Sequence, residues 1–288
     1  MNAIYKRELA SYFRSMTGYV LIAFLIIFAG IYFMVYNMYQ GYPYFSYALS
    51  SMLLILLIAV PVLTMRSFSE EKKSKTDQLL FTAPVKISRI VMGKYLAMVT
   101  VFLIPVLIFC LFPLIIKTQG TAYLLTDYCS ILQFFLLGCV FIAVGMFCSS
   151  LTESPVIAAV STFGASFVLY LWGHLVDYLP DTAVLNALIV ILICVGVAIW
   201  IYHMTKNLFL AVLVGAAGVI TCIVFLLIDT AYFEGLLASV LEKFNVLTGF
   251  DDAAFNSIFN LSAVVMQLTV AGVFVFLTMQ SIEKRRWS

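Results

Sequence analysis

Charge is the scarcest property of this sequence. Only 10% of its 288 residues are Asp, Glu, Lys or Arg and 64% are hydrophobic, whereas a soluble domain carries about 25% charged residues. From Ser15 to Met65 there is no charged residue at all. This composition excludes a soluble globular protein and indicates an integral membrane protein.

Sequence motifs for catalysis are absent as well. Gly93 and Lys94 are adjacent, but the upstream Gly and the following Ser or Thr of a phosphate-binding P-loop are missing, so ATP cannot bind here in that manner. An H-E-x-x-H motif or a pair of membrane acids is also missing, which argues against an intramembrane protease or a metal enzyme. We therefore expect no enzyme activity, no metal and no cofactor in this chain.

Clusters of ligating or charged residues are missing too. The six cysteines have no CxxC spacing, and the two histidines, His174 and His203, lie near opposite ends of their predicted spans. A zinc site or a disulfide framework needs clustered residues. The basic residues are sorted by membrane side and form no phosphate-tracking face, so a nucleic-acid partner is not expected.

The centres of the apolar runs hold no Asp, Glu, Lys or Arg. Ion-coupled transporters and pumps keep such residues there because a proton or sodium path requires them. The sequence also shows no internal repeat of the kind found in many secondary transporters. Both absences argue against a secondary transporter.

The apolar runs themselves predict the fold. A transmembrane helix needs roughly 20 residues, and eight runs are long enough. We expect one all-α polytopic domain, with a six-span core and an added hairpin (the sixth and seventh spans). The predicted spans are residues 18–36, 47–65, 91–116, 128–149, 155–176, 182–203, 207–228 and 260–281.

Two further segments are amphipathic. Residues 1–16 place Tyr5, Leu9, Tyr12, Phe13 and Met16 on one helical stripe, which predicts an elbow helix in the headgroup plane. A cleaved signal peptide is rejected, because the following run has full transmembrane length and no cleavage site closes it. On the far side, the loop 229–259 should carry an amphipathic helix from Tyr232 to Phe244.

The distribution of basic residues predicts the orientation. With eight spans and both termini in the cytoplasm, only Lys117 and Lys243 of the sixteen Lys and Arg residues fall outside. Such a bias strongly favours this topology.

The region 66–90 interrupts the apolar sequence. The stretch from Arg66 to Lys94 holds seven of the sixteen basic residues. Ser67 and Glu70 have capping-box spacing, which predicts a helix from Phe68 to Thr82. Two further features bear on that helix: Glu71 and Lys75 have favourable i,i+4 spacing, and Pro84 should end it. One interpretation is an exposed helix that contacts a soluble partner; the other is a solvated loop whose charges only orient the chain.

This stretch resembles the coupling region of permeases of the second exporter class of ABC transporters (ABC-2 type), followed here by Gly93 and Lys94. The family usually has Gly directly before the threonine that corresponds to Thr76, and Glu two residues after it. This chain has Lys75 and Gln78 at those two positions. The resemblance implies a cytoplasmic coupling helix that sits in a groove on a separate ATPase. The residues assigned to this coupling are Phe68, Glu70, Glu71, Lys72, Lys73, Lys75, Thr76, Asp77, Leu79, Leu80 and Pro84.

The last forty residues resemble the gliding-motility branch of the same family, with a closing segment from Ile282 to Trp287. The resemblance as a whole implies a bacterial cytoplasmic membrane protein that works with two ATPase copies and a second permease copy or a paralogue. The gliding-motility branch also implies an auxiliary membrane protein as a partner.

Two smaller features each allow two interpretations. Glu153 is the one charge in a tight turn between spans; it is either a second cytoplasmic contact or an acid that favours the helix dipole. A stripe of small residues in the fifth span either permits close helix packing or lines a translocation path. This stripe consists of Ser161, Thr162, Ala165 and Ser166.

These observations leave three hypotheses for function. The first is the permease subunit of an ATP-driven exporter of an unidentified, amphiphilic substrate. The second is a mechanical transmitter that uses the same ATPase to act on an extracytoplasmic partner without moving substrate. The third is an ATP-independent membrane scaffold.

Overall fold

The computed structural model describes residues 2–76, 86–179, 182–206, 209, 212–217, 221 and 234–287. The chain divides into two compact units, Met1–Tyr170 with Val246–Ser288, and Leu171–Asn245. All regular structure in the described ranges is helical.

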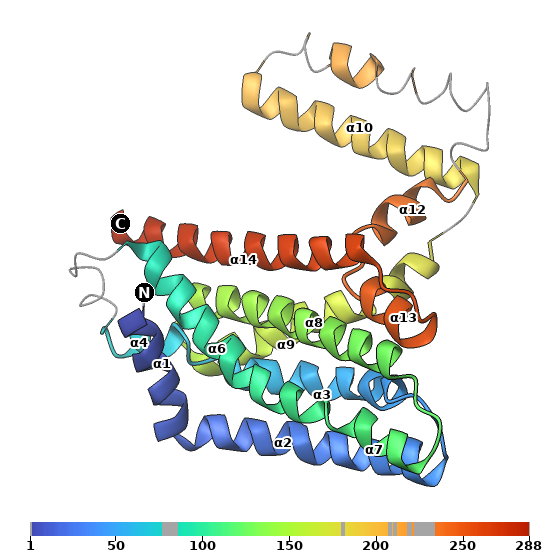
Figure 1. Cartoon of the computed structure of the whole chain (residues 1–288). Coiled ribbons are helices and arrows are strands. Elements are labelled where there is room, and N and C mark those ends of the chain that lie inside the picture. The colour runs from blue at the N-terminus through green and yellow to red at the C-terminus, as the bar shows by residue number, and fades with distance from the viewer. Residues whose placement is uncertain are drawn as a thin grey trace. The chain divides into compact units, whose positions relative to one another are not determined.

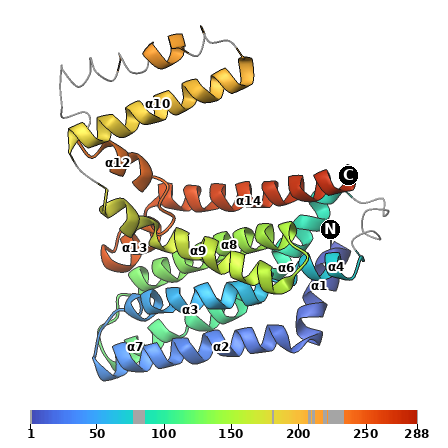
Figure 2. The ribbon, with the colours of Figure 1, turned by 180° about the vertical axis from the view of Figure 1, so that it is seen from behind.

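The first unit is a helical bundle in which α2, α3, α6, α8 and α14 run side by side (Figures 1 and 2). The N-terminus, α4 and the end of α14 lie together at one end of this bundle in both views. Its helices are α1 (Asn2–Arg14), α2 (Met16–Phe33), the π-helix η1 (Met34–Tyr39), α3 (Ser46–Thr64), α4 (Ser69–Lys73), α6 (Ile87–Phe109), α7 (Phe112–Gln119), α8 (Leu124–Leu151), α9 (Pro155–Asp177, which continues into the second unit), α13 (Thr248–Phe255) and α14 (Leu261–Trp287).

Six helical segments of the described ranges are long and apolar enough to cross a membrane. They are Met16–Tyr39, Ser46–Lys73, Ile87–Gln119, Leu124–Leu151, Pro155–Asp177 and Leu261–Arg285. These segments coincide with the six expected core spans outside the added hairpin, with ends that differ by at most eight residues.

The third of these spans also departs from its prediction. It begins at Ile87, inside the expected loop 66–90, and it is divided into α6 and α7. Pro113 is the second residue of α7. Because proline has no backbone N–H and its ring clashes with the carbonyl four residues back, it ends α6 at Phe109.

Helix α8 is the centre of the bundle and packs against α3, α6, α13 and α14. Its apolar side chains meet those of its neighbours in a core that includes Phe102, Phe134 and Phe141, all fully buried. A Cβ on Gly145 would lie 2.3 Å from Thr64 Oγ1 and 2.8 Å from Thr162 Cγ2. Glycine at this position therefore lets α3 and α9 approach α8.

At the opposite end of α8 from α4 lies a fully buried acid, Asp127. Its Oδ1 accepts the backbone N–H of Phe45 at 2.8 Å, directly before α3 begins. Next to it, the Ser46 hydroxyl donates to the carbonyl of Ala254 in α13 at 2.9 Å. Side chains from α8 and α3 thus tie three helices together at this end.

Helix α13 differs from the expectation for the loop 229–259, which included only one amphipathic helix near residues 232–244. Phe250 and Ala253 of α13 are fully buried. The helix packs against α8 and α3, because its small and aromatic side chains face the bundle. This part of the expected loop therefore belongs to the core of the first unit.

The second unit contains the end of α9, α10 (Ala183–Thr205) and α12 (Leu236–Glu242). Trp172 Nε1 donates to the carbonyl of Leu241 at 2.8 Å and so holds α12. Helix α10 coincides with the predicted span 182–203. Most of the predicted span 207–228, together with Tyr232 and Phe233, lies outside the described residues.

The N-terminal helix α1 packs against α6. Its expected membrane stripe faces protein instead: Tyr5 shares a hydrogen bond with Thr100 at 3.0 Å, and the Tyr12 hydroxyl donates to the carbonyl of Leu63 at 3.2 Å. Met16 is 82% exposed and belongs to α2. The stripe therefore covers part of the bundle, and its expected position in the headgroup plane stays a prediction.

Candidate functional site

The start of α4 is held by a side chain from another helix. Ser149, near the end of α8, accepts the backbone N–H groups of Phe68 at 3.1 Å and Ser69 at 3.2 Å. Its hydroxyl also donates to the carbonyl of Met65 at 3.2 Å. Ser149 thus satisfies two amides at the start of α4 that have no partner within the helix.

The predicted capping box is therefore wrong. Helix α4 begins at Ser69 with Phe68 as its N-cap, and no local side chain caps it. Ser67 lies one residue too early for that role, and its buried Oγ has no hydrogen-bond partner among the described residues. Glu70 is the second residue of α4, not the third that a capping box requires.

The end of α4 overturns the prediction of one helix from Phe68 to Thr82. The N–H of Thr76 bonds the carbonyl of Glu71, and the N–H of Lys75 bonds that of Lys72. These two bonds form a Schellman motif. Lys75 has a φ of 56°, in the left-handed region that favours glycine, so the helix ends after five residues.

Glu71 of α4 joins an ionic network with α1 and α6. Its Oε1 lies 2.8 Å from Lys94 Nζ and 3.4 Å from Arg7. Glu8 binds Arg7 at 2.7 Å and lies 3.5 Å from Lys94 Nζ. The expected Glu71–Lys75 pair does not form, because Lys75 lies beyond the end of α4.

Lys94 is the centre of this network and its side chain is 3% exposed. Its ammonium also donates to the carbonyl of Ser67 at 2.7 Å and lies 5.0 Å from the centroid of the Phe68 ring. A buried charge is tolerated only when it is paired and hydrogen-bonded. Lys94 therefore fastens α1 and the turn after α3 to the start of α6.

The network also affects the ionisation of its neighbours. The hydrogen bond to Glu8 raises the pKa of Arg7, so this guanidinium stays charged. Burial raises the pKa of Tyr12, which stays neutral and donates to the bundle.

A second link joins α4 to α8. Lys72 Nζ donates to the carbonyl of Ser150. Lys73, Lys75 and Thr76 are exposed at the end of the turn. The turn thus has one side fixed to α8 and α6 and another open to solvent.

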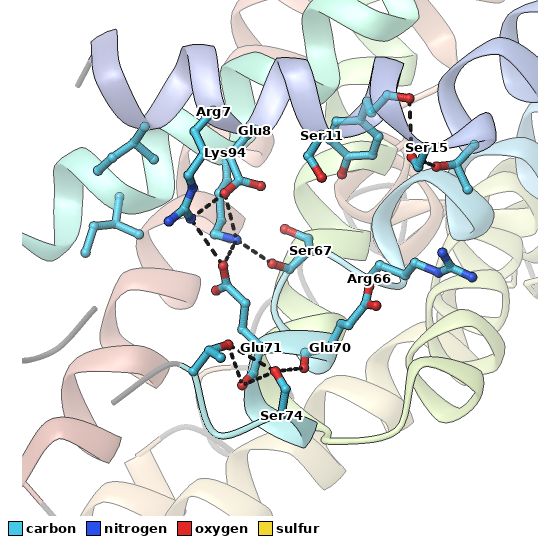
Figure 3. Close-up of a pocket in the computed structure, with 15 residues that line it drawn as sticks. Arg7, Glu8, Ser11, Ser15, Arg66, Ser67, Glu70, Glu71, Ser74 and Lys94 are labelled. Atoms are coloured by element: carbon cyan, nitrogen blue, oxygen red, sulfur yellow. Dashed lines mark hydrogen bonds and ion pairs between the residues drawn. The ribbon is translucent and has the colours of Figure 1, made fainter. Parts of the chain in front are cut away.

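A cavity of about 810 Å³ opens beside the network. Its walls come from α1, the start of α2, the turn and the start of α6 (Figure 3). Arg7, Glu8 and Glu71 converge on Lys94, whereas Arg66 is directed away from them (Figure 3). The lining residues are Ile4, Arg7, Glu8, Ser11, Tyr12, Ser15, Thr17, Arg66, Ser67, Glu70, Glu71, Ser74, Thr76, Ile90 and Lys94.

Glu153, for which two roles were considered, has a partner within the chain. It binds Arg285 of α14 at 2.9 Å, with side-chain exposures of 66% for Glu153 and 36% for Arg285. Exposed ion pairs contribute little stability. The pair nevertheless brings the turn between α8 and α9 to the end of α14.

The stripe of small residues in α9 is partly turned inward. Thr162 and Ser166 are fully buried, and Ser161 and Ala165 are half-buried. The Thr162 hydroxyl donates to the carbonyl of Ala158 in its own helix at 2.7 Å.

Four of the expected coupling residues, Asp77, Leu79, Leu80 and Pro84, lie outside the described residues. Among the described ones, no group of three His, Cys, Asp or Glu side chains is placed to hold a metal. Ser149 was missed by the sequence reasoning, since a serine at the end of an apolar run carries no signal of what it will cap.

A family model described as ABC-2 family transporter protein matches residues 36–183, just over half of the chain. The chain belongs to the ABC-2 transporter family. This ABC-2 protein is thus a membrane transport component, of a class that is generally not itself catalytic, and the family implies an ABC ATPase as partner. No curated protein is significantly similar to it.

The matched range contains the α4 turn, Lys94 and Ser149. It does not include residues 250–287, on which the resemblance to the gliding-motility branch rests. The match therefore supports an ABC-2 permease in general.

Proposed function

We propose that this ABC-2 protein is the permease of an ATP-driven exporter and that its ATPase docks on the turn formed by α4 and residues 74–76. ATP would be bound and hydrolysed on the separate ATPase. The permease would convert that cycle into movement of its spans.

One observation carries this proposal: the turn is fixed to three separate helices. Ser149 and Ser150 hold it to α8, and Lys94 holds it to α6 and, through Glu8, to α1. A solvated loop that only orients the chain needs no buried ion pair or buried cap. A force applied to this turn reaches α1, α6 and α8 directly.

The open side of the turn suits a soluble partner. Lys73, Lys75 and Thr76 are exposed there, and the expected coupling residues from Asp77 to Pro84 follow directly in the sequence. ATPase states that contact this side differently would shift the equilibrium between permease conformations, since only differential affinity shifts populations.

The remaining features of the proposal follow from the family resemblance. The permease acts as a dimer, with an identical copy or a paralogue, and binds two ATPase copies. It lies in a bacterial cytoplasmic membrane with both termini in the cytoplasm. Its cargo is amphiphilic, in keeping with spans whose centres hold no charge.

Co-purification tests the docking site. Charge reversal of Lys73 and Lys75 to Glu, or deletion of Ser69–Leu80, should abolish recovery of the ATPase with the permease. Reversal of Lys117, expected on the other side of the membrane, is the matched control. Undiminished recovery in the reversed protein would refute docking on the turn and would favour a scaffold.

A mechanical transmitter is the second candidate, and helix α12 is the feature that favours it. This short helix is anchored by Trp172 and carries exposed Val240 next to exposed Glu242 and Lys243. An auxiliary protein of the gliding-motility type is the partner to test. Transport in proteoliposomes supports the exporter, whereas capture of such a protein by α12 without transport supports the transmitter.

A further inference from the structure

The cavity beside Lys94 lies at the depth where spans begin and end. Its lining includes Ser15 and Thr17 at the start of α2, Arg66 and Ser67 just after α3, and Ile90 near the start of α6. These positions flank the ends of three candidate spans. Lipid headgroups occupy this depth on either side of a membrane.

The charges on the cavity wall are balanced, but only some are neutralised internally. Arg7 and Lys94 are paired with Glu8 and Glu71. Arg66 and Glu70 are both exposed, line the same cavity, and take part in no ion pair among the described residues. The cavity thus offers one free cation and one free anion to a ligand.

Hydroxyl groups supply most of the other polar lining. Ser11 of α1 and Ser15, just before α2, lie across from Ser67 and Arg66 (Figure 3). Ser67 is 4% exposed and its Oγ has no hydrogen-bond partner in the described part of the chain. Because this Oγ is itself fully buried, a ligand in the cavity can reach the hydroxyl of the exposed Ser11 but not that of Ser67.

We propose that this cavity binds the headgroup of a phospholipid that carries a primary ammonium, of the phosphoethanolamine type. Arg66 binds the phosphate, because a guanidinium matches phosphate oxygens in geometry. Glu70 accepts hydrogen bonds from the ammonium. The acyl chains remain in the bilayer beside the start of α2.

The chemistry excludes other ligand classes. An anionic headgroup without an ammonium would leave Glu70 without a partner, and an apolar ligand would leave both charges without one. Glu70, Ser74 and Thr76 of the turn also line the cavity, so a segment of the docked ATPase is the alternative occupant that the test must distinguish. The volume of about 810 Å³ falls in the usual range for small-ligand sites, about 300–1,000 Å³.

The test is lipid binding to the full-length permease in nanodiscs without any ATPase, measured by native mass spectrometry. The lipids are phosphatidylethanolamine, phosphatidylcholine and phosphatidylglycerol. Phosphatidylcholine is the decisive comparison, since its quaternary ammonium cannot donate a hydrogen bond. We expect phosphatidylethanolamine to bind about tenfold more tightly, the factor expected for one charge-assisted hydrogen bond.

Variants then assign the two ends of the headgroup. Glu70→Gln should reduce phosphatidylethanolamine binding to the level of phosphatidylcholine, and Arg66→Gln should weaken binding of all three lipids. Lys73→Gln and Glu283→Gln are matched controls, because both residues are exposed and neither lines the cavity. Equal binding of the three lipids, or an unaltered preference in Glu70→Gln, would overturn the proposal.

Two further outcomes separate the sources of the ligand. Soluble glycerophosphoethanolamine should not displace the lipid; displacement at equal concentration would show a soluble ligand and overturn the lipid assignment. A photo-crosslinker at Ser11 should label lipid in the assembled transporter. Labelling of the ATPase instead would show that a protein segment fills the cavity.

Discussion

Replacement of Ser149 by alanine should loosen the α4 turn without unfolding the bundle. The hydroxyl accepts two backbone N–H groups and donates to one carbonyl. Each buried group left unpaired costs about 1–3 kcal/mol, and loss of an N-cap about 0.5–2 kcal/mol. Because α4 is short and water can reach its exposed side, we expect a local loss of about 2 kcal/mol.

This loss has a measurable consequence at Lys73 and Lys75, which are exposed. When local opening precedes cleavage, the cleavage rate follows the population of the open state. A change of about 2 kcal/mol increases that population roughly 30-fold. Trypsin should therefore cleave Ser149→Ala after these lysines roughly 30-fold faster than the unchanged protein.

The matched control is the neighbouring residue. Ser150 is equally buried, but its hydroxyl bonds only the carbonyl of Phe147 in its own helix, at 2.7 Å. Ser150→Ala should therefore leave cleavage within about threefold of the unchanged protein. Equal cleavage of both variants would show that Ser149 does not hold the turn.

Three further predictions concern stability. Lys94→Met should destabilise the chain by about 3 kcal/mol, because Glu71 is left without its closest cation. Adding Glu71→Gln should recover part of this loss, measured by thermal unfolding. Additive losses in the double variant would contradict the pairing. Lys75→Gly should raise the melting temperature slightly by removing up to about 1 kcal/mol of left-handed strain, and a lowered melting temperature would contradict the turn geometry. Gly145→Ala should destabilise the chain by about 1–3 kcal/mol through overpacking. Gly164→Ala should have little effect, because no atom lies within 4 Å of the added Cβ. Equal melting temperatures for the two variants would argue against the close approach of α3 and α9 to α8.

The core spans follow from the sequence because each apolar run is long and bounded by polar residues. Local signals served less well where distant residues decide. Ser67 and Glu70 had the spacing of a capping box, yet Ser149, far along the chain, supplies the cap. The apolar stripe of α1 was correctly located, but periodicity alone does not distinguish a face that contacts lipid from one that contacts protein.

The ionic network could be predicted in part. The position of Glu71 in an exposed helical turn was expected, but its partner was not, because Lys94 belongs to the next span and Glu8 to the first helix. Pairings between helices depend on how the helices pack, which one sequence does not reveal. The position of Lys75 shows the reverse case: the family usually has glycine there, and the left-handed φ of 56° explains why.

Helix α8 fixes the starts of two other helices. Ser149 holds the start of α4 near one terminus of α8, and Asp127 holds the residue before α3 near the other. Asp127 and Ser149 are 22 positions apart in the uninterrupted helix α8, so the two anchors stand about 33 Å apart. A stiff rod of this length cannot slide along its axis without straining both anchors together, so the two surfaces of the membrane share one mechanical element.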